Sequence, residues 1–118
     1  MNVMDYIMAE KIRQEMTNEE FAKKLPFSRQ RYEELVKQKD CQFRIVRTML
    51  NALGKDIDVL TREGGEPPFD KAGFFAQLES TNVFFGKEKA VVETMGLAFY
   101  IVPAGASESA PMEEKILL

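Results

Sequence analysis

The chain has 118 residues, 45% of them apolar and 30% charged, with no histidine, no tryptophan and one cysteine. This size and composition are typical of one globular domain, or of one domain with a small appendage. Without histidine, the chain alone cannot form a Ser-His-Asp triad, a Cys-His dyad or an imidazole-ligated metal site. A single cysteine excludes an internal disulfide and favours a reducing cytoplasm. We therefore expect a protein that is not an enzyme and holds no cofactor and no metal.

The formal net charge of −3 hides a division along the chain. Residues 1–62 hold 12 basic and 10 acidic side chains, a net of +2, whereas residues 63–118 hold 4 and 9, a net of −5. Residues 28–47 alone hold six basic and three acidic side chains. Such a local excess suits either a nucleic-acid partner or a solvated helix face. No run approaches the roughly 18 apolar residues of a membrane span, and no secretory signal is recognisable.

The N-terminal part predicts two helices in quick succession. Apolar side chains recur at three- to five-residue steps over residues 3–15, as on one face of a helix. This face consists of Val3, Met4, Ile7, Met8 and Ile12. Thr17 and Glu20 have the spacing of a capping box, which predicts a second helix beginning at Thr17 and ended by Pro26. Its inward side chains are Phe21, Ala22 and Leu25.

Two further helices are predicted before a change of pattern. Ser28 can cap a third helix, whose inner face carries Tyr32, Leu35 and Val36. After a polar stretch over 37–42, a fourth helix over about 43–53 is predicted, with Gly54 ending it. The inward side chains of the fourth helix are Phe43, Val46, Met49, Leu50 and Leu53.

Residues beyond Gly54 mix strand and helix signals. Ile57 and Val59 alternate with acidic residues, which fits a short strand or a last helical turn. Residues 64–68 read Gly-Gly-Glu-Pro-Pro and predict a linker. Residues 69–78 predict a helix, residues 87–95 fit either a helix or a strand, and Leu97–Val102 predicts a strand that ends at Pro103.

The segment from Thr17 to Val36 reads Thr-Asn-Glu-Glu-Phe-Ala-Lys-Lys-Leu-Pro-Phe-Ser-Arg-Gln-Arg-Tyr-Glu-Glu-Leu-Val. It resembles the helix-turn-helix of the lambda-repressor/Cro family, also called the xenobiotic-response-element type. Ala22 stands where two crossing helices need a small residue, and apolar residues stand where the crossing is sealed. Residues 43–60 resemble the closing helix of that family, so the resemblance covers about residues 3–61. Pro26 departs from it, because the family usually has glycine there, and proline requires a different turn.

The resemblance implies a regulator that binds double-stranded DNA, with the third helix as its recognition helix. Arg29 and Arg31 would each bridge a guanine, and Gln30 would pair with adenine. Ser28 would contact bases less selectively. The remaining implied contacts are to phosphate, from Thr17, Asn18, Arg44 and Arg47.

The sequence as a whole predicts a mainly α protein in four parts. A four- or five-helix lambda-repressor-like helix-turn-helix domain would occupy residues 1–63, and a linker residues 64–68. Residues 69–103 would form a small α+β segment, and residues 104–118 a largely disordered tail. The resemblance implies a homodimer, and Leu97–Val102 would suit a strand that adds to its own copy in a second subunit.

The second part holds most of the aromatic residues, which about 50 residues cannot bury well alone. We therefore expect it to dock on the first domain or on a partner. The residues expected at such a contact are Phe74, Phe75, Phe99 and Tyr100. The ending of this part, a helix, a glycine, an apolar strand and a proline, looks like the C-terminal ends of antitoxins of the same family. Together with the acidic character of the second half, this resemblance implies an alternative function: an antitoxin or a phage-type inhibitor that acts mainly through a protein partner such as a toxin.

Two further features suggest chemistry only weakly. Cys41 has basic neighbours that would lower the pKa of its thiol, but without a histidine base it is more simply an incidental cysteine. Asp56 and Asp58 alternate and would point the same way, as two ligands of a metal would. No third ligand has a suitable spacing, so solvated carboxylates are the simpler interpretation.

Overall fold

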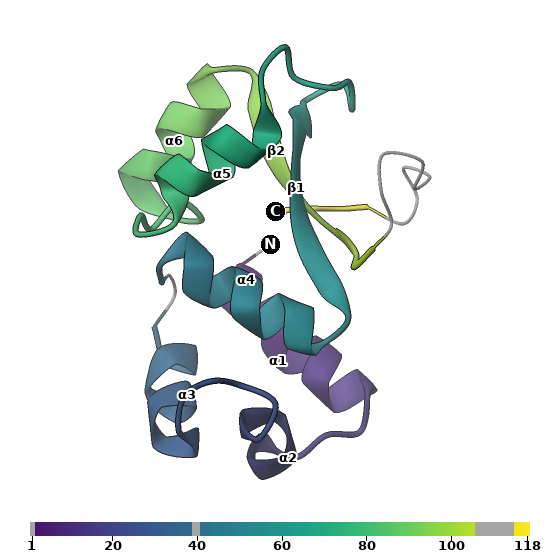
Figure 1. Cartoon of the computed structure of the whole chain (residues 1–118), viewed down its shortest axis with the longest axis vertical. Coiled ribbons are helices and arrows are strands. Elements are labelled where there is room, and N and C mark those ends of the chain that lie inside the picture. Colours follow the sequence, from purple (N-terminus) through teal and green to yellow (C-terminus); the bar gives the residue numbers. More distant parts are fainter. Residues whose placement is uncertain (1, 39–40, 106–114) are drawn as a thin grey trace.

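The computed structural model describes residues 2–38, 41–105 and 115–118. Within these residues the chain is mainly helical, with six helices and a small three-stranded antiparallel sheet (Figure 1). The helices are α1 (Val3–Arg13), α2 (Asn18–Ala22), α3 (Arg29–Val36), α4 (Phe43–Ala52), α5 (Lys71–Leu78) and α6 (Gly86–Thr94). The strands are β1 (Lys55–Thr61), β2 (Leu97–Pro103) and β3 (Ile116–Leu117).

The sheet joins the two halves of the chain. β1 pairs along its whole length with β2, from Lys55 opposite Pro103 to Thr61 opposite Leu97. β2 also pairs with β3, at Tyr100 and Ile101. The predicted strand over Leu97–Val102 is therefore confirmed, but it is the central strand of the sheet. The expectation that the whole strand adds to a second subunit is wrong for this arrangement, because β1 occupies one edge of β2 and β3 occupies the other edge at Tyr100 and Ile101.

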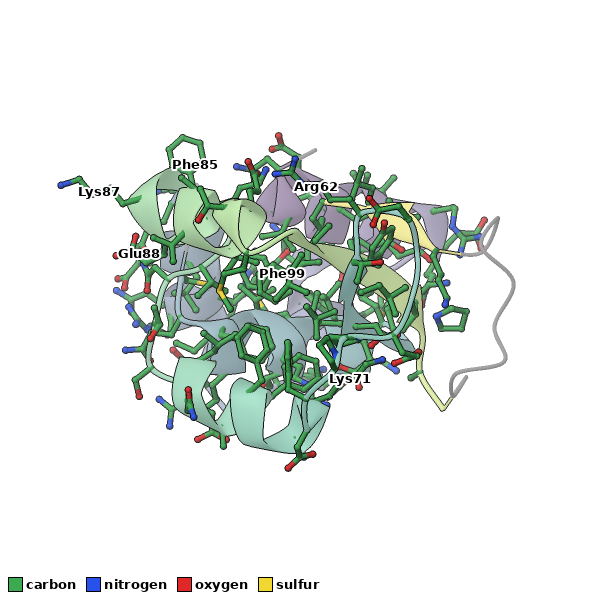
Figure 2. All side chains as sticks on the ribbon, turned by 90° about the horizontal axis from the view of Figure 1, so that it is seen from above. Arg62, Lys71, Phe85, Lys87, Glu88 and Phe99 are labelled. Atoms are coloured by element: carbon green, nitrogen blue, oxygen red, sulfur yellow. The ribbon has the colours of Figure 1, made fainter. Side chains whose placement is uncertain are left out.

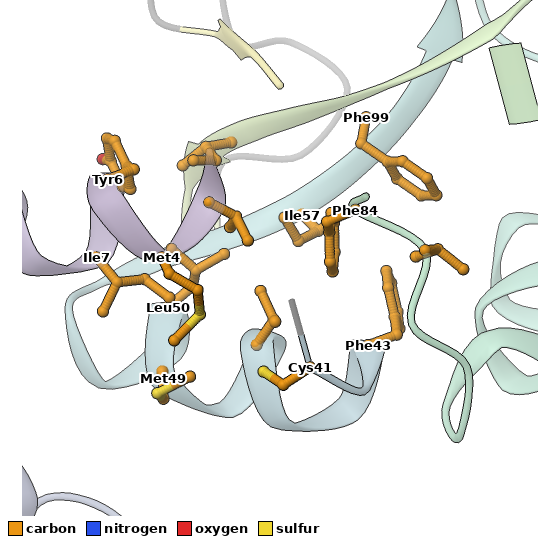
Figure 3. Close-up of a cluster of buried hydrophobic side chains, with 14 of the residues drawn as sticks. Met4, Tyr6, Ile7, Cys41, Phe43, Met49, Leu50, Ile57, Phe84 and Phe99 are labelled. Atoms are coloured by element: carbon orange, nitrogen blue, oxygen red, sulfur yellow. The ribbon is translucent and has the colours of Figure 1, made fainter. Parts of the chain in front are cut away.

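One core runs through both halves of the chain. The ring of Phe43, at the start of α4, lies 5.7 Å from that of Phe84 and 6.0 Å from that of Phe99. Met49 and Leu50 of α4 are fully buried and belong to the same core (Figure 3). The aromatic residues of the second half thus pack against the first half of the chain. This is one of the two alternatives expected from the sequence, the other being a contact with a partner. In Figure 1, α4 lies in the middle, with α2 and α3 at one end and α5 and α6 at the other.

Two glycines with left-handed backbone end helices and lead into strands. Gly54 (φ +75°) follows α4 and precedes β1, and Gly96 (φ +75°) separates α6 from β2. A side chain at either position would strain the backbone, since residues other than glycine rarely adopt positive φ. The predicted stop at Gly54 is confirmed, and the two open alternatives are resolved as a strand at Ile57–Val59 and a helix over Gly86–Thr94.

The predicted inner face of the first helix is only half right. Val3, Met4 and Ile7 are buried, whereas Met8 and Ile12 are exposed to 39% and 66%. The buried stripe passes instead through Tyr6, Glu10 and Lys11. Glu10 and Lys11 have long side chains whose charges are paired or hydrogen-bonded, which allows a helix to bury them where the sequence pattern suggests a polar face.

The predicted end of the second helix differs from the one observed. α2 ends at Ala22, because the ring of Pro26 would clash with the carbonyl of Ala22 in a continued helix and Pro26 has no N–H to donate. The chain instead closes two tight turns, from Lys24 N to Phe21 O and from Leu25 N to Ala22 O.

The C-terminal residues also differ from expectation. Ile116–Leu117 form β3, so a largely disordered tail is wrong for these two residues. Residues 106–114, which the same expectation covered, lie outside the described residues. The predicted helix over 69–78 begins at Lys71, where Asp70 caps it by accepting bonds from the amides of Ala72 and Gly73.

Candidate nucleic-acid interface

The start of α2 is fixed by a complete capping box. The Thr17 hydroxyl accepts a bond of 3.1 Å from the Glu20 amide, and the Glu20 carboxylate accepts one of 3.1 Å from the Thr17 amide. Asn18 comes next, and its side-chain oxygen accepts a bond from the Lys11 ammonium of α1. The Asn18 side-chain NH₂ group can still donate. Thr17 and Asn18 thus lie at the N-terminus of α2, which is the positive end of the helix dipole. The first turn of α2 faces solvent.

The contact between α2 and α3 is apolar. Phe21 of α2 is fully buried, and its ring meets the Tyr32 ring of α3 edge to face, with the ring centroids 5.2 Å apart. Ala22 and Leu35 are buried as well. An edge-to-face aromatic pair is directional, so this contact holds α3 in a defined orientation against α2. The inner faces predicted for these two helices are confirmed.

The first turn of α3 is exposed and polar. Ser28 caps the helix, accepting a bond of 3.1 Å from the Arg31 amide. The side chains of Arg29, Gln30 and Arg31 are all exposed, and none of them contributes to the core. The first turn therefore presents three consecutive hydrogen-bonding side chains to solvent, while the helix is anchored in the interior through Tyr32.

Both arginines of this turn have an acidic neighbour on the same helix. The Arg29 Nε donates to a Glu33 oxygen over 2.9 Å, which raises the pKa of the guanidinium. Arg31 lies 3.8 Å from Glu34. Each arginine side chain is at least 50% exposed, and exposed ion pairs of this kind contribute little to stability. The guanidinium groups can therefore exchange these partners for another acceptor at small cost.

The two arginines predicted on the fourth helix have different surroundings. Arg44 is exposed, and its guanidinium donates a long bond of 3.3 Å to Gln42. Arg47 binds both carboxylate oxygens of Asp56, and its guanidinium lies 5.0 Å from the centre of the Phe75 ring. A guanidinium engaged on two sides is held within the fold. Within the fold the partner of Arg47 is therefore Asp56 of β1, and its contact with phosphate stays a prediction.

The sequence did not reveal the role of Asp56 and Asp58. The two carboxylates were expected to be solvated, but their side chains are only 28% and 18% exposed. Asp56 pairs with Arg47, and Asp58 pairs with Lys71. Each also accepts a bond from the next backbone amide, over 2.7 Å at Ile57 and 2.9 Å at Val59. The strict alternation of acidic and apolar residues was the signal, since it marks a strand whose acids share one face.

The four residues predicted at a partner contact are buried or half-buried in the fold. Phe99 and Tyr100 are each 4% exposed, and Phe74 and Phe75 are half-buried and packed against the core. Phe99 and Tyr100 therefore present almost no surface to a partner while the chain is folded in this way. Cys41 is 4% exposed and belongs to the same core, where Figure 3 shows it close to Phe43.

Comparisons with protein-family models, with curated proteins and with solved structures found no match for this chain. In the part of the chain that the structure describes, acidic and cysteine side chains do not gather in threes as a metal site would need. Of the helices described over residues 2–38, 41–105 and 115–118, none has the length and apolar character required to cross a membrane.

Proposed function

We propose that the chain is a cytoplasmic, sequence-specific DNA-binding regulator of transcription, of the repressor type. In this proposal α2 and α3 form a lambda-repressor-like helix-turn-helix, and α3 enters the major groove of double-stranded DNA. The observation that carries the proposal is the first turn of α3. Arg29, Gln30 and Arg31 are exposed there on a helix whose opposite face is fixed by Tyr32.

The chemistry of these side chains suits the edges of bases. A guanidinium can donate two bonds to the O6 and N7 of guanine, and the Gln30 amide matches the N6 and N7 of adenine. Thr17 and Asn18 stand at the start of α2, where the helix dipole favours a phosphate. Arg44 is free to add a phosphate contact. Two copies are expected to act together, because paired half-sites about one helical turn apart need two recognition helices.

The test begins by selecting a binding site from a pool of random double-stranded DNA. Fluorescence anisotropy then gives the affinity for that site at several salt concentrations. We expect the Arg31→Ala variant to lose about 1–3 kcal/mol of binding free energy at the selected site. Lys87→Ala removes an exposed charge from α6 and serves as the control, because α6 lies at the other end of the molecule (Figure 1). The proposal fails if binding is absent or does not weaken with salt.

A second candidate function is suggested by the charges next to the recognition turn. Glu33 and Glu34 pair with both arginines, so this exposed face carries no net positive charge. Residues 63–118 are acidic as well. These features suit a module that acts mainly on a protein, as an antitoxin or a phage-type inhibitor does, with weak DNA binding.

Purification of the tagged chain from its native cells distinguishes the two functions. A stoichiometric protein partner, together with DNA binding that is unchanged by Arg29→Ala and Arg31→Ala, favours the second. A chain that purifies alone and binds a selected DNA site through these arginines favours the first.

A further inference from the structure

A cavity of about 330 Å³ lies between α6, the first part of β2 and the C-terminal residues Leu117 and Leu118. Its apolar walls come from Phe84, Val92, Leu97 and Phe99, and from Leu117 on the outer side. Four of these side chains are buried, at 3–7% exposure, whereas Leu117 is 56% exposed. The cavity is therefore bordered by the hydrophobic core on its inner side and is open to solvent on the side of Leu117. Its volume is near the lower end of small-molecule sites, which span about 300–1,000 Å³.

Charged groups stand at the mouth of this cavity. Arg62, which follows β1, donates a bond of 2.8 Å to the Glu93 carbonyl near the end of α6. Within the described residues this bond holds the guanidinium beside the cavity, and the remaining guanidinium N–H groups can donate to a ligand. Lys89 also lines the cavity, with its ammonium 3.9 Å from the Glu93 carboxylate. Among the side chains that line the cavity, two cations and one carboxylate leave a net charge of +1.

The edge of β2 adds a polar backbone to the same cavity. β3 pairs with β2 at Tyr100 and Ile101, and the Leu118 amide bonds to the Phe99 carbonyl. Backbone groups two residues apart on a strand point to the same edge, so the N–H and C=O of Leu97 face this edge too. β3 does not extend to Leu97 in the described residues. The floor of the cavity thus combines apolar side chains with one backbone donor and one acceptor.

These features define a ligand by its shape and charge. Apolar walls require an apolar body, and the volume admits a body the size of one aromatic ring or a short alkyl chain. The surplus positive charge at the mouth favours one negative charge on the ligand, and Arg62 offers the paired donors that a carboxylate accepts. A dinucleotide or another large cofactor would not fit in 330 Å³.

We propose that this cavity binds a small monoanionic amphiphile, an aryl or short-chain carboxylate, with its carboxylate at Arg62 and Lys89 and its apolar body against Phe99. The proposal is independent of DNA binding, since the cavity lies at α6, at the opposite end of the molecule from α3 (Figure 1). Figure 2 shows Arg62 beside α6 and Phe99 beneath it, while Lys87 of the same helix extends away into solvent.

The probe is 4-phenylbutyrate, titrated into the ¹⁵N-labelled chain and followed by two-dimensional NMR. The same titration with 4-phenylbutanol and 4-phenylbutylamine keeps the apolar body and changes only the charge of the head. We expect the amides of Val92, Leu97 and Phe99 to shift. The acid should bind most tightly and the amine most weakly, with the acid ahead of the alcohol by about fivefold or more.

Three variants locate the two parts of the ligand. Arg62→Gln should weaken the binding of phenylbutyrate by about tenfold and leave that of phenylbutanol unchanged. Lys87→Gln is the matched control and should change neither. Leu117→Trp fills the cavity from its exposed side and should abolish the binding of both compounds. Arg62, Lys87 and Leu117 are all exposed, so these variants are expected to fold, and a thermal melt checks this.

Three outcomes would overturn the proposal. The first is that the acid, the alcohol and the amine bind equally, which would make the charged rim irrelevant. The second is that no amide around the cavity shifts at millimolar phenylbutyrate. The third is that a short apolar peptide binds along β2 while phenylbutyrate does not, which would identify the edge at Leu97 as a docking site for a strand.

Discussion

Arg47 of α4 and Asp56 of β1 form a two-point ion pair across the turn at Gly54. Arg47 Nε lies 2.8 Å from Oδ1 of Asp56, and Nη2 lies 3.3 Å from Oδ2. The bond to Asp56 raises the pKa of Arg47. Phe75 of α5 packs its ring against the same guanidinium at 5.0 Å. One side chain thus connects a helix of the first half, a strand of the sheet and a helix of the second half.

The connection predicts a measurable coupling between Arg47 and Asp56. We expect Arg47→Met and Asp56→Asn each to destabilise the fold, and the double variant to lose less than the sum. Because the two side chains are 37% and 28% exposed, water screens the pair, and the coupling should be about 1 kcal/mol. Urea unfolding of the four proteins measures it. Arg44→Met, on the same helix, should show no coupling to Asp56→Asn, and an equal coupling there would contradict this account.

Glu10 predicts an acid-sensitive contribution to stability. Its side chain is 7% exposed, and bonds from Arg13 hold the pKa of its carboxyl at about 2 despite the opposing effect of burial, with Gln14 adding a further bond. The unfolded value is about 4.3. Because the pKa of the Glu10 carboxyl is lower in the folded than in the unfolded chain, its ionised form stabilises the fold. This contribution to stability is fully present above about pH 4.3 and is lost as the pH falls towards about 2.

Glu10→Gln isolates this contribution, because glutamine keeps the shape and cannot ionise. At pH 7 the variant should lose about 1–2 kcal/mol of unfolding free energy, less than the full pKa difference implies because water screens the exposed Arg13. The difference between the two proteins should vanish near pH 2. Glu63→Gln changes an exposed acid and should give a curve parallel to the wild type. A Glu10→Gln curve that also runs parallel would exclude the assignment.

The left-handed backbone at Glu15 leads us to expect that a substitution there stabilises the fold. It has φ +61° directly after α1, where the amides of Glu15 and Met16 bond to the carbonyls of Ile12 and Lys11. This is the pattern of a Schellman motif, in which glycine is the preferred residue at the left-handed position. Glu15→Gly should raise the unfolding free energy by about 0.5–1 kcal/mol, since it relieves the crowding of Cβ. Glu15→Ala removes the carboxylate and keeps Cβ, so a gain of equal size there would attribute the effect to charge.

The local features of the fold were largely predictable from the sequence. Thr17 with Glu20 and Ser28 identify two helix starts, and Gly54 identifies a stop, because caps depend on the chemistry of residues close together in the chain. The inward faces around Phe21 and Tyr32 follow from helical spacing in the same way. These are also the residues that hold the candidate recognition helix.

The contacts between distant residues were not predictable in this way. The pairing of Arg47 with Asp56 depends on how β1 folds back beside α4, and the sequence shows only two ordinary charged residues. Glu10 is buried because Arg13 and Gln14 satisfy it, which a polar position in a helical pattern does not reveal. The cavity at Arg62 needs β1, α6 and β3 to meet. Features of this kind depend on tertiary packing.

The last prediction concerns the outer edge of β1, which we expect to resist pairing with a strand of another molecule. The edge amides of Ile57 and Val59 donate to Asp56 and Asp58, and the Thr61 amide donates to the Gly65 carbonyl. An edge strand with satisfied amides and charged side chains offers few donors to a second sheet. We expect the double variant Asp56→Ser, Asp58→Ser to self-associate at concentrations where the wild type does not, as measured by sedimentation velocity.

The control for this experiment must change the net charge equally and leave the edge intact. The double variant Glu63→Ser, Glu88→Ser does so with two exposed acids. If it associates as strongly as the β1 variant, the loss of charge repulsion is sufficient, and the two aspartates do not act through the edge amides. If only the β1 variant associates, and hydrogen exchange at Ile57 and Val59 slows on association, the free amides are the surface that pairs.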